Sequence, residues 1–75
     1  MKLPVVSGRK VAKALERLGF EIQPGRGKGS HMALRNGATR RTVTIPDHRE
    51  LDRGTLRAIL RQADVTQEEF VEALK

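Results

Sequence analysis

The 75-residue sequence contains no cysteine, tryptophan or tyrosine, and only two phenylalanines. Without cysteine the chain has no disulfide, thiolate metal site or cysteine nucleophile, a composition that suits a reducing compartment. With so few aromatic side chains, stacking on nucleic-acid bases cannot be its main mode of binding. No window approaches the roughly 18 apolar residues of a membrane span, and the apolar N-terminal run is shorter than that of a secretory signal. We therefore expect a soluble, cytoplasmic protein with no membrane partner.

Acidic residues are scarce over most of the chain. Residues 1–63 carry 14 Lys and Arg against 5 Asp and Glu, a charge of +9, whereas residues 64–75 carry 1 against 4, a charge of −3. The length allows one domain, residues 1–75, with a small core. The positive excess favours a polyanionic partner, and no basic segment has the bulky apolar face of a membrane-surface helix. Nucleic acid, bound through its backbone, is the partner that the composition favours.

The apolar pattern predicts six elements. A helix begins at the N-cap Ser7 and ends before Gly19, and strands follow at residues 20–22, 31–35 and 41–45, with a turn at Asn36-Gly37 between the last two. A polar connector over 47–54 precedes a second helix, which has apolar residues at 56, 59, 60 and 63 on one face. A capping box from Thr66 to Glu69 opens a short third helix. The order α-β-β-β-α-α predicts an α+β fold, with three helices packed on one face of a three-stranded antiparallel sheet.

His31 is the residue that the pattern singles out for chemistry. Because Met32 and Leu34 would face the core, His31 and Arg35 project from the uncovered face of the sheet. The preceding residues 25–30, with alternate glycines and two cations, are equally compatible with a tight hairpin loop or a phosphate-binding nest. Histidine exchanges protons near neutral pH, and Lys28 and Arg35 are candidates to stabilise charge on a phosphate. The carboxylates are scattered, so we predict no metal site and no cofactor.

The sequence also resembles the HicA toxin family. The resemblance is carried in order by Gly19-Phe20, Gly29-Ser30-His31, Thr44-Ile45-Pro46, Gly54-Thr55-Leu56 and Glu69-Phe70, which together cover nearly the whole chain. It implies a fold similar to the double-stranded-RNA-binding domain, a toxin that cleaves mRNA independently of translation, and a HicB antitoxin as partner. The family's catalytic histidine falls on His31. The sequence departs from the family at Asp47, where a second histidine is frequent, so His48 receives only a secondary role, as does Ser30.

We therefore predict a metal-independent endoribonuclease with His31 as its single catalytic histidine and an antitoxin that covers it. A non-catalytic module that binds double-stranded RNA is the alternative, and a DNA-binding domain is disfavoured because no helix-turn-helix pair precedes the strands. The arginine stripe at 53, 57 and 61 is open to two interpretations, a solvated helix face or a phosphate-binding surface, and we take the second. The predicted RNA-binding residues are Lys10, Lys13, Lys28, Arg35, Arg53, Arg57 and Arg61.

Overall fold

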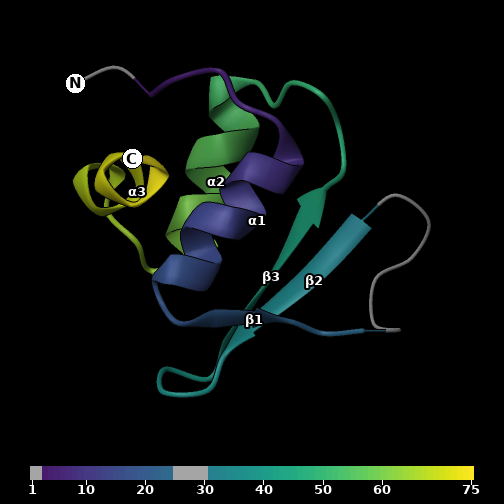
Figure 1. Ribbon diagram of the computed structural model, residues 1–75, viewed down its shortest axis with the longest axis vertical. Helices are drawn as coiled ribbons and strands as arrows, with labels where there is room; N and C mark the ends of the chain where they lie inside the picture. The colour runs from purple at the N-terminus through teal and green to yellow at the C-terminus, as the bar shows by residue number, and fades with distance from the viewer. Residues whose placement is uncertain (1–2, 25–30) are drawn as a thin grey trace.

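A computed structural model of the protein describes residues 3–24 and 31–75 (Figure 1). The elements are α1 (Gly8–Arg17), β1 (Phe20–Ile22), β2 (His31–Asn36), β3 (Arg41–Pro46), α2 (Arg53–Ala63) and α3 (Gln67–Leu74). The strands form one antiparallel sheet in the order β1-β2-β3. The predicted α-β-β-β-α-α order and the α+β fold are confirmed.

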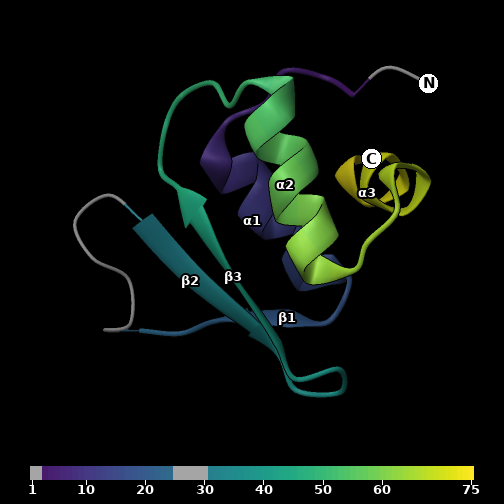
Figure 2. The same cartoon turned by 180° about the vertical axis from the view of Figure 1, so that it is seen from behind.

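The helices lie on one side of the sheet, in two ranks. Helix α1 packs on β1 and β3 and α2 packs on β3, whereas the main contacts of α3 are with α1 and then α2 (Figures 1 and 2). The apolar stripe predicted for α2 is buried throughout, and Phe70 anchors α3 in the same core. No helix in the described part of the chain has the length and apolar character needed to cross a membrane.

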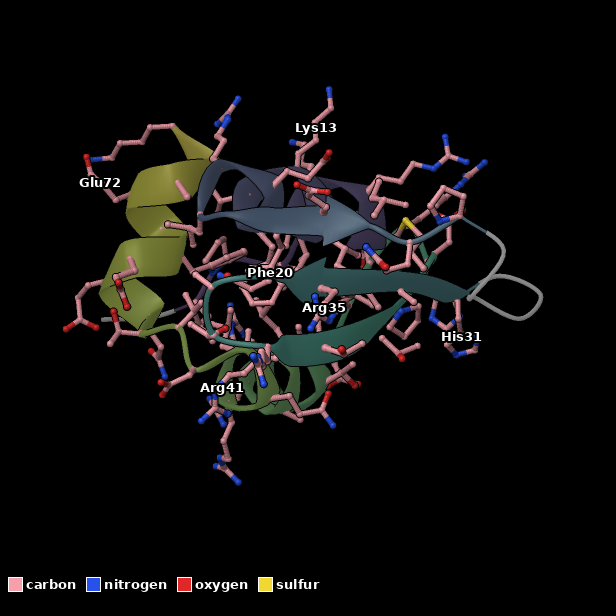
Figure 3. All side chains as sticks on the ribbon, turned by 90° about the horizontal axis from the view of Figure 1, so that it is seen from below. Lys13, Phe20, His31, Arg35, Arg41 and Glu72 are labelled. Carbon is pink, nitrogen blue, oxygen red and sulfur yellow. The ribbon has the colours of Figure 1, made fainter. Side chains whose placement is uncertain are left out.

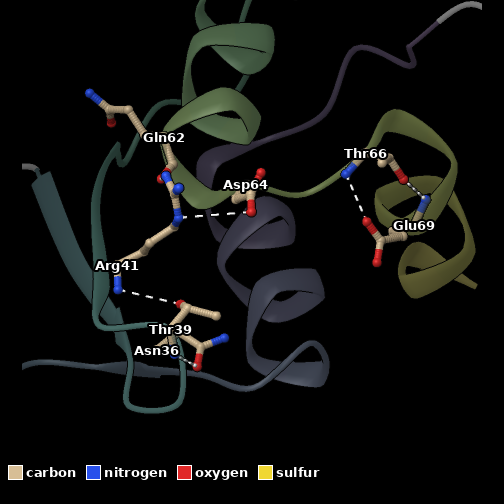
Figure 4. Close-up of polar contacts among 7 residues, drawn as sticks. All are labelled: Asn36, Thr39, Arg41, Gln62, Asp64, Thr66 and Glu69. Carbon is tan, nitrogen blue, oxygen red and sulfur yellow. Dashed lines mark hydrogen bonds and ion pairs between the residues drawn. The ribbon is translucent and has the colours of Figure 1, made fainter.

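Polar side chains define where the helices begin. Ser7 accepts from the Lys10 amide of α1, and Thr66 and Glu69 form the predicted capping box of α3 (Figure 4). The Asp52 carboxylate accepts from the Thr55 amide at 2.6 Å, so α2 begins at Arg53 rather than after the connector. These hydrogen bonds to the charged form lower the pKa of Asp52 and of Glu69 below their ordinary values.

The connector predicted to be polar contains a core residue. Leu51 is fully buried, and its amide donates to the Val6 carbonyl at 2.8 Å in an isolated antiparallel bridge. Leu3 is buried in the same cluster, and the Arg53 side chain donates to its carbonyl at 2.8 Å. The N-terminal segment is thus part of the core, because its apolar residues cover the start of α2.

Two details of the sheet depart from the simple pattern. The alternation predicts Phe20 and Ile22 on the core side, and Phe20 is buried, but Ile22 is 44% exposed where the three-residue edge strand β1 ends. The turn after Asn36 is a four-residue loop, closed by the Arg40 amide donating to the Asn36 carbonyl at 2.7 Å. The residue in the left-handed conformation there is Arg40, at φ 63°, rather than Gly37.

Candidate functional site

His31 is the first residue of β2, and its side chain is exposed. Its neighbours along the strand alternate as predicted, with Leu34 buried against the helices and Arg35 exposed on the opposite face. Figure 3 looks onto the sheet with α1 and α2 behind it, and both His31 and Arg35 are visible from this side. The helix-free face of the sheet therefore presents the histidine to a ligand.

The surface beside His31 is flat because its side chains are small. Directly paired residues of an antiparallel sheet share a face, so Ala33 lies beside Thr44, and Arg35 lies between Glu21 and Thr42. None of these five residues is a bulky apolar or aromatic side chain. An extended polymer could lie across this face without steric obstruction.

Arg35 is too far along the strand to share one phosphate with His31. The two residues are four positions apart, about 13 Å at the rise of a β-strand. Side chains stand roughly perpendicular to a sheet, so their tips keep a similar separation. Arg35 is therefore suited to a neighbouring phosphate of a bound chain, rather than to the group next to the imidazole.

The chain beyond β3 continues past His31, and the start of α1 holds it there. His31 pairs with Pro46 across the sheet, and the His48 carbonyl accepts from the Gly8 amide at 2.9 Å. A Cβ at Gly8 would lie 1.9 Å from the Pro46 carbonyl oxygen. Only glycine permits this approach, which brings Asp47 and His48 to the same end of the sheet as His31.

Charged side chains surround a surface hollow at this end of the molecule. Arg9 Nε donates to Asp47 Oδ1 at 3.1 Å, and Arg9 Nη2 donates to the second oxygen at 3.3 Å. The hydrogen bond to Asp47, followed by the charge of that carboxylate, raises the pKa of Arg9. The hollow has a volume of about 310 Å³ and is lined by Ser7, Arg9, Asp47, His48 and Arg49. His48 thus lies in a polar surface hollow, in keeping with its secondary role.

Sequence reasoning missed Arg9 and Arg49. Arg9 was one of several cations along the first helix, and its partner Asp47 is 38 positions away. No local spacing identifies such a pair. The weak signal was Gly8, a glycine at the first position of a helix, which marks a place where another segment comes close.

The basic residues predicted to bind RNA do not form one surface. Lys10 and Lys13 line a groove between α1 and α3, and in Figure 3 Lys13 points away on the α1 side while His31 lies at the end of β2. Arg57 and Arg61 are exposed along α2 and line a shallow hollow there. Arg53 is partly engaged, because its Nε holds the Leu3 carbonyl.

Lys28 and Ser30 lie outside the described residues. Chain connectivity still bounds their position, because consecutive Cα atoms are 3.80 Å apart. Lys28 is three residues from His31, so the two Cα atoms are at most about 11 Å apart. Lys28 remains a candidate for contact with a phosphate beside the imidazole.

The chemistry that this arrangement offers is proton transfer by one imidazole near cationic side chains. Within residues 3–24 and 31–75, no three His, Asp or Glu side chains gather in a way that could hold a metal ion. Histidine serves as a general base or acid near neutral pH, and nearby cations stabilise negative charge that develops on a phosphate.

Comparison with known proteins gives one result. The family model described as the HicA toxin of bacterial toxin–antitoxin matches residues 8–65, well over half of the chain. The match spans α1, the whole sheet and α2, and it includes His31, Asp47 and His48. No curated protein matches the sequence.

Proposed function

The chain belongs to the HicA toxin family, and from this premise we propose that it is the toxin of a toxin–antitoxin pair that cleaves mRNA as a metal-independent endoribonuclease. His31 is the catalytic residue. The observation that carries the proposal is the position of His31, exposed on the helix-free face of the sheet beside small side chains. That face has room for an extended RNA strand, whereas the opposite face is filled by helices.

The reaction needs one base and stabilisation of the phosphate. The His31 imidazole takes the proton of a ribose 2′-OH, and the 2′ oxygen forms a bond to the adjacent phosphorus. The bond from phosphorus to the 5′ oxygen breaks, and that oxygen takes a proton from solvent. The products are a 2′,3′-cyclic phosphate and a 5′-OH end. This sequence assigns proton removal to His31 and leaves His48 secondary.

Two cations complete the proposed site. Lys28, within about 11 Å of His31 along the chain, would neutralise the phosphate that reacts. Arg35, about 13 Å along the strand, would bind a neighbouring phosphate and fix the register of the RNA. The exposed arginines of α2, Arg57 and Arg61, would attract the RNA as it approaches.

An antitoxin that restrains this activity has a simple route. Covering one exposed imidazole would silence the site, so we place a HicB-like antitoxin over His31 and Arg35. Acidic antitoxin residues would speed the encounter with this basic chain, and apolar contacts would slow release.

The test is the chemistry of the cut. Purified protein should cleave RNA in the presence of EDTA, leave a 2′,3′-cyclic phosphate or its 3′-phosphate hydrolysis product, and fail on a substrate with 2′-deoxyribose at the cut. Loss of activity in EDTA with recovery in magnesium would refute the 2′-OH mechanism. Tight binding of duplex RNA without cleavage would favour the non-catalytic binding module instead.

A further inference from the structure

A groove runs between α1, α3 and the N-terminal segment, on the helical side of the molecule (Figure 1). Its volume is about 330 Å³. Because an apolar cavity of about 150 Å³ accepts one benzene, this groove has room for roughly two large apolar side chains. The floor is apolar and contains no aromatic ring, since its lining consists of Pro4, Val6, Ala14, Ala73 and Leu74.

The rim of this groove is cationic. Lys10, Lys13 and Arg17 line it at positions i, i+3 and i+7 of α1, which places them along one helix face over about 10 Å of axis. Among the described residues none of the three is ion-paired with a carboxylate. Glu72, on the adjoining turn of α3, is already paired with Lys75 at 3.2 Å. The groove therefore presents unneutralised positive charge above an apolar floor.

Arg17 also fixes the shape of the groove. Its Nη1 donates to the Ala73 carbonyl at 2.6 Å and to the Lys75 carbonyl at 3.0 Å, and so ties the end of α1 to the end of α3. These acceptors are carbonyls that the end of a helix leaves without intrahelical donors. A guanidinium has five N–H donors, so further donors remain for a ligand.

We propose that this groove is a docking site for an acidic, amphipathic helical segment of the partner antitoxin. Two apolar side chains of the segment would enter the groove, and carboxylates spaced at i, i+3 or i+4, and i+7 would meet the three cations. The apolar floor favours a peptide over RNA, because an RNA backbone has no apolar side chain to bury there and the floor has no ring on which bases could stack. The proposal departs from the sequence-based prediction that Lys10 and Lys13 bind RNA. It relies on the proposed function only for the existence of a protein antitoxin.

This placement gives the antitoxin a second contact, away from His31. A segment in the groove does not cover the helix-free face of the sheet, so it would tether the antitoxin and raise the local concentration of whatever covers the site. The toxin would then keep its grip on the antitoxin when RNA competes for the face around His31.

The groove can be tested with a blocked peptide of about 16 residues, long enough for a helix, that repeats Glu and Leu at the spacings above. Binding to the full-length protein is measured by fluorescence anisotropy, and the site is mapped by amide chemical shifts. We expect the largest shifts at Val6, Ala14 and Leu74. The double variant Lys10→Glu/Lys13→Glu should weaken binding about tenfold or more. Peptides with Gln in place of Glu, or Ser in place of Leu, should also bind more weakly.

The matched control changes the same charge elsewhere. Arg57→Glu/Arg61→Glu on α2 should leave peptide affinity nearly unchanged, and equal weakening by both double variants would mean that only net charge is sensed and would overturn the proposal. Shifts confined to the sheet face, or stronger shifts in the groove with a short single-stranded RNA than with the peptide, would overturn it as well. His31→Ala should bind the peptide as the parent does. Failure of RNA cleavage and failure of groove binding are therefore separately visible.

Discussion

Replacing Gly8 by alanine tests the packing that holds the Pro46–His48 segment beside His31. The added Cβ would lie 1.9 Å from the Pro46 carbonyl oxygen and 3.0 Å from its carbon, both of them backbone atoms. Since such contacts are essentially never shorter than 3.0 Å, the two segments must separate by about 1.1 Å. The Gly8 amide also donates to the His48 carbonyl at 2.9 Å, and that hydrogen bond would lengthen.

The magnitude follows from these contacts. Overpacking costs about 1–3 kcal/mol and the weakened hydrogen bond about 1 kcal/mol, whereas alanine regains at most about 1 kcal/mol of helix propensity. We expect Gly8→Ala to lower the free energy of unfolding by roughly 1–3 kcal/mol, which for a domain of this size lowers the Tm by roughly 5–15 °C. The assay is thermal unfolding followed by circular dichroism.

Gly54→Ala is the matched control, because Gly54 also lies in the first turn of a helix. A Cβ there would meet only Asp52 Oδ1, at 3.3 Å, an end that can rotate slightly. We expect its Tm to stay within a few degrees of the parent or to rise. Equal Tm values for Gly8→Ala and the parent would refute the close-packing argument, and so would an equal loss in both variants.

Three further predictions concern helix ends and surface charge. Asp64→Gly should raise the Tm by about 4–8 °C, because Asp64 has φ 58° and carries its charge at the C-terminus of α2, while its 4.0 Å contact with Arg41 is exposed and weak; an unchanged or lower Tm would contradict this. The folded state lowers the pKa of Asp52 and Glu69, so their contribution to stability is present above the ordinary values of 3.8 and 4.5 and is lost as the pH falls through the lower folded values; the Tm measured against pH should fall less steeply in Asp52→Asn/Glu69→Gln, and an identical slope would contradict the assignment. If Arg57 and Arg61 contact RNA phosphates, changing both to Gln should flatten the slope of log affinity against log salt by about 0.7–0.9 per charge, and an unchanged slope would return them to a solvated helix face.

Most of the architecture could be predicted from local sequence signals. Ser7 and the Thr66–Glu69 box mark helix starts through hydrogen bonds within three residues, and the alternation around Leu34 places His31 and Arg35 on the open face. These signals are reliable because each is fixed by a short stretch of chain.

The features that were missed depend on contacts between distant segments. Leu51 is buried because it meets Val6, and Arg9 is ion-paired because α1 lies against Asp47. The separation of Lys10 and Lys13 from His31 likewise follows from the packing of α3 against α1, which no spacing within one helix reveals. Charge counts predicted a polyanion binder but could not divide its cations among three surfaces.

The most direct test of the central claim is RNA cleavage by His31→Ala measured beside the parent, with the Tm of both proteins determined under the same conditions. Because general acid–base catalysis contributes about 10²–10⁴-fold, the variant should cleave at least about a hundredfold more slowly, while its Tm and its affinity for RNA remain close to those of the parent. Cleavage at the parental rate by a folded His31→Ala protein would contradict the account.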